Sequence, residues 1–177
     1  ERMREGRYQL LEYTLFLDTN ALLNLGESAF KEPFVISQKT LEEIENIKTS
    51  GHKDGEIKYK ARHVAHLLDD HYDEYKVISY HEKVKNIIKD FSLEETPDNI
   101  ILASAYYYNK EIRPVIVCTD DLNCKFISRD IFGLRTKGIN EINLVKNIDE
   151  YTGYKDVTLS DEEMSDFYCN LNENTFD

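Results

Sequence analysis

The chain of 177 residues is poor in residues that interrupt regular structure, with only three prolines and seven glycines. This scarcity argues against long linkers and low-complexity segments. No apolar run is long enough to cross a bilayer, and the N-terminus, ERMREGRYQLLEYTLF, lacks the small-residue cleavage site of a secretory signal. We therefore expect a cytoplasmic protein that is not embedded in a membrane, built around one α/β core.

Two further absences narrow the chemistry. Cys118, Cys124 and Cys169 are odd in number and form no CxxC pair, so neither a disulfide framework nor a structural zinc site is indicated. The sequence has no GxxxxGKS or GxxxxGKT phosphate-binding loop. We expect that this chain alone does not hydrolyse ATP.

The net charge of −12 looks unfavourable for binding nucleic acid, whose phosphates attract Lys and Arg. However, residues 149–177 carry nine acids and one base, which leaves a net charge of only −4 for residues 1–148. A few acids held around metal ions would account for that remainder. We accordingly divide the chain into one domain at 1–148 and an acidic C-terminal extension at 149–177.

Short apolar runs alternate with stretches of helical periodicity along the chain. Strands are expected at 14–17, 33–37, 77–80 and 113–119, with an edge strand within 132–139. Helices are expected within 37–51, 52–75, 81–91 and 96–110, and a further one through 126–127. Strands that alternate with helices indicate an α/β fold with a mainly parallel, doubly wound sheet.

The stretch TLFLDTNALL, residues 14–23, places an acid at the end of the first strand. Asp18 follows four strand-forming residues, and Thr19 or Asn20 can cap the helix that begins next. Strand-to-helix junctions of this kind are where open α/β sheets bind their ligands. The alternative is that Asp18 is itself only the helix cap, since Asp is among the commonest cap residues.

Four acids occupy comparable positions along the predicted fold. Asp18 and Asp121 follow strands whose carboxyl ends share one edge of the sheet, and the helix-borne Glu43 and Asp98 lie near helix starts. Four carboxylates in one cleft repel one another unless cations neutralise them, which favours Mg²⁺ or Mn²⁺ and phosphoryl chemistry. Taken singly, Asp18 and Asp98 could instead be caps, Glu43 a solvated charge and Asp121 a turn residue.

The order of four sequence blocks resembles that of the PIN-domain ribonucleases. FLDTNALL, TLEEIENIK, TPDNIILASAYYY and VIVCTDDLNCKFISR occur in the family's order, and DEYTGYKDVTLSDEEMSDFY resembles the tail that follows the PIN domain of certain PhoH-like ATPases. The resemblance covers residues 14 to about 145. It implies a three-layer α/β/α PIN-like fold and a Mg²⁺- or Mn²⁺-dependent endoribonuclease that cuts single-stranded RNA.

The resemblance also implies roles for individual residues. The catalytic, metal-binding acids would be Asp18, Glu43, Asp98 and Asp121, supported by Asn20 and Thr119. Glu43 is preferred to Glu42, and Asp121 to Asp120, because they match the family's acids, although both neighbours stay open. Phosphate contacts are expected from basic residues on two segments: Lys58, Arg62, Lys125 and Arg129. Arg62 has the alternative of a plain surface cation, and Cys124 and Lys125 depart from the family's Leu and Arg.

The same resemblance suggests a partner. In the related ATPases the tail leads into an ATPase domain, so a PhoH-like ATPase, fused or separate, is an expected partner, with residues 149–177 as the linker. Homo-oligomerisation is left open. Two other functions are retained: a PIN domain that binds RNA or protein without cutting, and a stand-alone toxin-type PIN nuclease.

Overall fold

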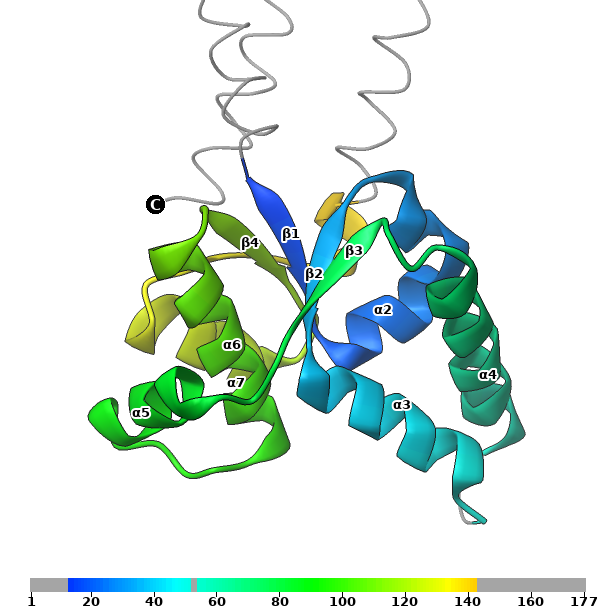
Figure 1. The fold of residues 1–177 in the computed structure, drawn as a ribbon, viewed down its shortest axis with the longest axis horizontal. Coiled ribbons are helices and arrows are strands. Elements are labelled where there is room, and N and C mark those ends of the chain that lie inside the picture. Colours follow the sequence, from blue (N-terminus) through cyan, green and yellow to red (C-terminus); the bar gives the residue numbers. More distant parts are fainter. Residues whose placement is uncertain (1–12, 52–53, 143–177) are drawn as a thin grey trace, which may run out of the picture.

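The computed structural model describes residues 13–51 and 54–142 (Figure 1). Five short strands form one sheet, and the three central strands arise from runs of apolar or β-branched residues, which suit a strand covered on both faces. The strands are β1 (Thr14–Leu17), β2 (Phe34–Ser37), β3 (Tyr75–Ile78), β4 (Val115–Cys118) and β5 (Arg135–Lys137). Their order in the sheet is β3-β2-β1-β4-β5, and every pair is parallel.

This strand order reverses direction at β1. The chain moves outward from β1 through β2 to β3, then returns to the other side of β1 as β4 and continues to β5. The predicted doubly wound parallel sheet is therefore confirmed, with β5 as one edge strand. In such a sheet the point of reversal leaves a crevice outside the carboxyl ends of the two central strands. Here those strands are β1 and β4.

Side chains alternate across the sheet and build a core on each face. On β1, Leu15 and Leu17 belong to one core while Phe16 belongs to the other, and all three are buried. Residues of β4 divide in the same way, with Ile116 on the first face and Val117 on the second. Strands β1 and β4 thus supply apolar area to both faces, and burial of such area is the dominant stabilising term.

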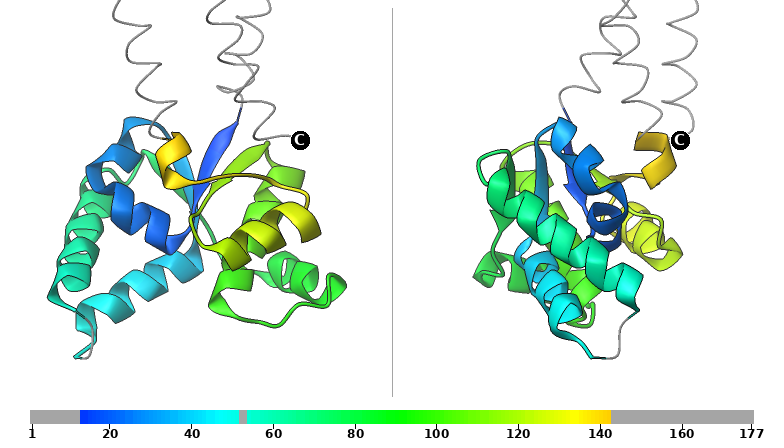
Figure 2. Two further views of the ribbon diagram at one scale, coloured as in Figure 1. Left: turned by 180° about the vertical axis from the view of Figure 1, so that it is seen from behind. Right: turned by 90° about the vertical axis from the view of Figure 1, so that its right-hand side faces the viewer.

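Helices cover both faces and complete the three layers (Figures 1 and 2). The first core lies under α2, α3 and α4, and the second lies under α5, α6 and α7. The helices are α2 (Thr19–Leu25), the 3-10 helix η1 (Gly26–Lys31), α3 (Gln38–Thr49), α4 (Gly55–Asp70), α5 (Glu82–Asp90), α6 (Pro97–Glu111), α7 (Leu122–Phe126) and the π-helical η2 (Ile127–Ile131). This arrangement confirms the predicted α/β/α fold.

Strand β3 begins and ends two residues earlier than the sequence predicts. Its last pairing is Ile78 with Ser37, and Ser37 is already the N-cap of α3, so the neighbouring strand has ended. Two residues later, the backbone N–H of Tyr80 donates to Gln38 Oε1 at 2.8 Å and not to a neighbouring strand. The end of β3 is thus set by the end of β2. The apolar pattern of residues 77–80 contains no information about that neighbour.

Of the cap residues that the sequence leaves open for α2, the structure has Asp18 and not Thr19 or Asn20. Asp18 is the N-cap of α2, and its Oδ1 accepts the Ala21 N–H at 2.7 Å. Among the residues that the structure describes, no helix is both long and apolar enough to cross a membrane. The predicted boundary at 148 and the extension at 149–177 lie outside the described residues.

Candidate active site: an acidic cleft

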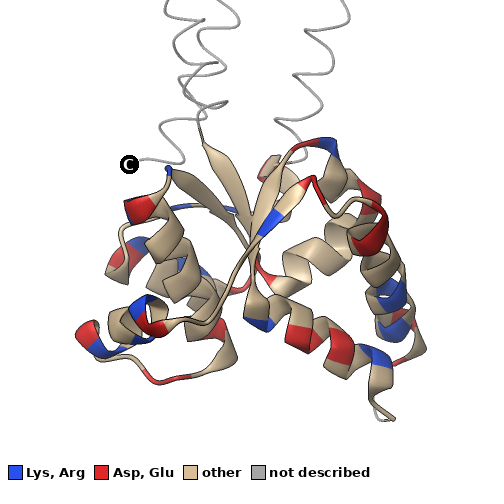
Figure 3. Ribbon diagram, in the orientation of Figure 1, with Lys and Arg blue, Asp and Glu red and all other residues tan. Residues whose placement is uncertain are grey.

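An open cleft of about 400 Å³ lies outside the carboxyl ends of β1 and β4. It is at the point of strand reversal, where the fold class places ligand sites. Figure 3 shows acidic positions in red along α3, which forms one wall of the cleft. The lining residues are Asp18, Thr19, Asn20, Glu43, Asn46, Ile47, Ser50, Asp98, Ile101, Asp121 and Cys124. The cleft brings all four predicted acids together, and no Lys, Arg or His is among these lining residues.

Asp18 is the most buried of the four acids, at 6% exposed. Burial raises the pKa of its carboxyl to about 6, and the charges of Asp98 and Asp121 add to the rise. Hydrogen bonds from the Thr119 hydroxyl and the Ala21 N–H oppose it. Asp18 is thus both a helix cap and a cleft acid, so the two alternatives left open by the sequence hold together.

Asp98 and Asp121 reach the cleft from the opposite wall. Thr96, not Asp98, caps α6: its Oγ1 accepts the Asn99 N–H at 3.2 Å, which leaves Asp98 in the first turn without a capping role. Asp121 does cap α7, where its Oδ1 accepts the Cys124 N–H at 2.9 Å. Burial raises the pKa of Asp98, and the nearby Asp121 charge raises it further.

In each of the two pairs of adjacent acids that the sequence leaves open, the two side chains have different environments. Glu43 lines the cleft, whereas Glu42 is exposed and pairs with Lys39 at 3.1 Å. Asp121 lines the cleft, whereas Asp120 Oδ1 accepts the Ile139 N–H at 3.0 Å and so ties β4 to the segment after β5.

The two supporting residues occupy different places. Thr119 is fully buried, and its hydroxyl accepts the Asp121 N–H at 3.1 Å while donating to Asp18. It therefore connects the ends of β1 and β4. Asn20 lies on the cleft lining with an exposed side chain.

The basic residues expected to meet phosphates lie outside the cleft lining. Lys58 and Arg62 are on α4, with Arg62 exposed. Lys125 Nζ lies beside Gly138, next to Asp120. Arg129 pairs with Asp130 at 3.0 Å and sits over the Phe126 ring. Their contact with a substrate stays a prediction.

Sequence reasoning missed part of the cleft. The sequence suggests Thr19 only as a helix cap, yet its hydroxyl donates to Glu43 Oε1 at 2.7 Å. Cys124 also lines the cleft, and burial together with the three aspartates raises the pKa of its thiol. No periodicity or spacing signals these contacts, because they join elements that are distant in sequence.

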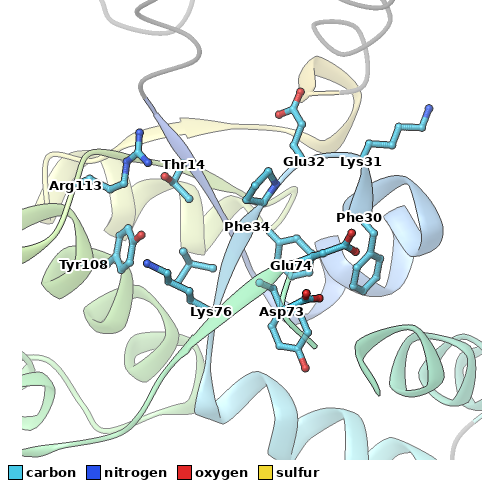
Figure 4. A pocket seen from close by; sticks show the side chains of 13 residues that line it. Thr14, Phe30, Lys31, Glu32, Phe34, Asp73, Glu74, Lys76, Tyr108 and Arg113 are labelled. Carbon is cyan, nitrogen blue, oxygen red and sulfur yellow. The ribbon is translucent and has the colours of Figure 1, made fainter. Parts of the chain in front are cut away.

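A second pocket, of about 330 Å³, lies at the opposite edge of the sheet, where β1, β2 and β3 begin (Figure 4). Its lining mixes basic and acidic side chains, such as Lys76 and Arg113 with Asp73 and Glu74. The acidic cleft differs from it in carrying charge of one sign only. That difference makes the carboxyl-edge cleft the candidate active site.

The cleft's chemistry fits a cation, although it is not a tight preformed centre. Within residues 13–51 and 54–142, no three Asp, Glu, His or Cys side chains are gathered closely enough to form a ready-made metal site. The four carboxylates are nevertheless oxygen donors, which Mg²⁺ and Mn²⁺ prefer, and Mg²⁺ commonly keeps several waters between itself and the protein. Burial is the main cause of the raised pKa values of Asp18 and Asp98, and repulsion from neighbouring aspartates adds to it, so a cation would relieve the second cause.

Comparison with known proteins gives three findings. A family model described as PIN domain matches residues 15–137. Protein PhoH2 of Bacillus subtilis (strain 168) is 29% identical over 174 residues, a match that covers 86% of this chain and 38% of PhoH2. A crystal structure of VapBC2 from Rickettsia felis, bound to a DNA fragment from the promoter, is 17% identical with a TM-score of 0.47, covering 71% of this chain and 98% of that chain.

Proposed function

The chain belongs to the PIN domain family, whose members are typically nucleases, and from this premise we propose that it is a ribonuclease dependent on Mg²⁺ or Mn²⁺. It would hydrolyse phosphodiester bonds of single-stranded RNA. The observation that carries the proposal is the cleft in which Asp18, Glu43, Asp98 and Asp121 meet among lining residues that include no basic side chain. A cation would stabilise such a set by reducing the repulsion within it, and phosphodiester hydrolysis is the chemistry that a hard cation supports there.

The chain's residues would hold the ion and prepare the site. When bound, the divalent ion would supply an activated water and would neutralise charge on the leaving oxygen. Asp18 is fixed by Thr119 and the Ala21 N–H, and Asp121 by the Cys124 N–H, so both carboxylates are set before any ligand arrives. Carboxylates held in this way lose little conformational entropy on binding.

The substrate and partner follow from the resemblance and from the extent of the match. Lys58, Arg62, Lys125 and Arg129 are proposed to meet RNA phosphates outside the cleft, where salt would weaken their contribution. The chain spans 38% of the length of PhoH2, so a PhoH-like ATPase segment, fused or separate, is proposed as the partner. Residues 1–148 would be the nuclease domain and residues 149–177 the linker toward that partner.

The first test is cleavage of an end-labelled single-stranded RNA in Mn²⁺, Mg²⁺ or EDTA, beside an Asp98→Asn variant. Asp98 gives the cleanest variant because Thr96 already caps α6 and Asn keeps the shape of the side chain. We expect metal-dependent cutting that falls at least ~100-fold in the variant, since metal-ion catalysis contributes several kcal/mol and each 1.36 kcal/mol is tenfold in rate.

Equal cutting in EDTA would contradict the metal requirement, and a wild-type rate in Asp98→Asn would remove this acid from the site. A folded wild-type protein that retains RNA in Mn²⁺ without cutting it would instead support the non-cleaving alternative.

A matched pair of substitutions tests the choice between the adjacent glutamates. Glu43→Gln should lower the cleavage rate at least ~10-fold, because it removes one of the charges around the proposed ion. Glu42→Gln should leave the rate unchanged, because Glu42 is exposed and its pairing with Lys39 is a surface ion pair. The measurement is the single-turnover rate in saturating Mn²⁺. The reverse pattern would assign the role to Glu42.

A further inference from the structure

Thr19 connects the two elements that hold the first two acids of the cleft. It is the first residue of α2, directly after Asp18, and is only 7% exposed. Its Oγ1 lies 2.7 Å from Glu43 Oε1 and 3.2 Å from Thr40 Oγ1, and Thr40 is fully buried. Thr40 and Glu43 are three residues apart on α3, so they lie on the same face of that helix.

The direction of this small network follows from the number of protons. A hydroxyl has one proton to donate, and a bond to a carboxylate is stronger than a bond to another hydroxyl. The Thr19 proton therefore goes to Glu43, at the shorter distance. The 3.2 Å contact, in which Thr19 Oγ1 would donate to Thr40 Oγ1, is then the weaker alternative for the same proton.

Glu43 differs from the other three acids in its surroundings. The charges of Asp98 and Asp121 both act on Asp18, whereas Glu43 does not contribute to the shift of the Asp18 pKa. Asp18 and Asp121 are held by backbone N–H groups of their own helices, and the short contact that holds Glu43 comes from the hydroxyl of another helix. A glutamate has one more rotatable bond than an aspartate, so fixing it costs more side-chain entropy.

We propose that Thr19 is a positioning residue that aims the Glu43 carboxylate into the cleft. The inference rests on the proposed function only for its effect on cleavage, since the position of Glu43 is a property of the metal-free chain. Removing the hydroxyl leaves Glu43 its charge but not its orientation. Partners that orient ligands of a metal typically change metal affinity or activity 10- to 100-fold when they are mutated.

The test compares Thr19→Val with Thr19→Ser in the full chain. Valine keeps the shape of threonine and loses the hydroxyl, whereas serine keeps the hydroxyl and loses the methyl group. We expect Thr19→Val to weaken Mn²⁺ binding, measured by calorimetry without RNA, by about 10-fold and to lower the cleavage rate similarly. Thr19→Ser should restore both. If serine is as damaging as valine, the loss comes from packing and the proposal is wrong.

A double-mutant cycle separates positioning from any independent role of Thr19. In a Glu43→Gln background, Thr19→Val should produce no further loss of Mn²⁺ affinity, because the carboxylate that it orients is already gone. Additive losses would overturn the proposal. Thr40→Val, which removes the longer contact of the Thr19 hydroxyl and leaves its bond to Glu43 in place, should show a smaller loss than Thr19→Val.

A metal-free readout keeps this inference distinct from the nuclease proposal. In a crystal structure of Thr19→Val without divalent ions, the Glu43 carboxylate should leave its present position or occupy several rotamers. If it stays in place, the positioning role is contradicted whether or not the wild-type protein cuts RNA. If it moves while the wild type neither binds Mn²⁺ nor cuts RNA, the proposed function fails and the positioning role stands.

Discussion

Asp18→Asn should abolish metal-dependent RNA cleavage while making the metal-free protein more stable at pH 8. Asparagine is as good a helix cap as aspartate, and its side-chain oxygen can keep the bond from the Ala21 N–H. The substitution therefore removes the charge without removing the cap. Loss of a buried carboxylate from the centre of the cleft should lower the cleavage rate by ~100- to 1000-fold, on the scale of several kcal/mol for metal-ion catalysis.

The gain in stability has its origin in the same charge. Burial and the neighbouring acids raise the Asp18 pKa from 3.8 to about 6, so ionised Asp18 costs the folded state about 3 kcal/mol at pH 8. Asn removes that cost and should raise the free energy of unfolding, measured by urea titration in EDTA. Asp54→Asn is the matched control, because Asp54 caps α4 away from the cleft lining. It should change neither cleavage nor the stability at pH 8 appreciably.

A variant that keeps the wild-type rate would remove Asp18 from the proposed mechanism. A variant that loses both cleavage and stability would show that Asp18 acts only as the cap of α2. Removal of an uncompensated buried charge predicts instead a lower cleavage rate together with a higher free energy of unfolding. Lower activity combined with higher stability is therefore the result that identifies Asp18 as an acid kept for function at a cost to the stability of the fold.

The sequence predicts the edge of the sheet where the acids meet, because the ends of β1 and β4 are marked by an abrupt change from apolar residues to acids. Asp18 and Asp121 follow unbroken apolar runs, and a parallel sheet places the carboxyl ends of such runs side by side. Thr96 and Pro97 both favour the start of a helix, so the sequence predicts the start of α6 and, with it, the position of Asp98 in the first turn. These features are local, and local patterns suffice to predict them.

Contacts between distant segments could not be predicted in the same way. Whether Asp120 or Asp121 enters the cleft depends on the Ile139 N–H, 19 residues away, which holds Asp120 outside it. The end of β3 depends on Ser37 in the neighbouring strand. Periodicity describes which face of an element is buried, but it contains no information about which polar group of another element arrives there.

The pH dependence of stability gives the second large effect, and its sign distinguishes this cleft from an ordinary set of surface acids. An acid whose folded pKa is raised binds its proton more tightly in the folded state than in the unfolded one. Well below its unfolded pKa of 3.8 Asp18 is protonated in both states and has no effect, and well above its folded pKa of about 6 it is ionised in both and imposes its full cost. In EDTA the wild type should therefore lose stability, relative to Asp18→Asn, as the pH rises from 4 to 6.

Mn²⁺ should reverse this loss at pH 7.5, because a ligand that binds only the folded state stabilises it by about 2.7 kcal/mol at 100 times its Kd. Urea titrations at pH 4.5, 6 and 7.5, with EDTA or Mn²⁺, provide the measurement for both proteins. The wild type should gain stability from Mn²⁺ at pH 7.5 and much less at pH 4.5, where protonated Asp18 competes with the ion. The variant should gain little at any pH. A wild type that is equally stable with and without Mn²⁺ at pH 7.5 would mean that the repulsion among the acids is relieved by something other than a divalent ion.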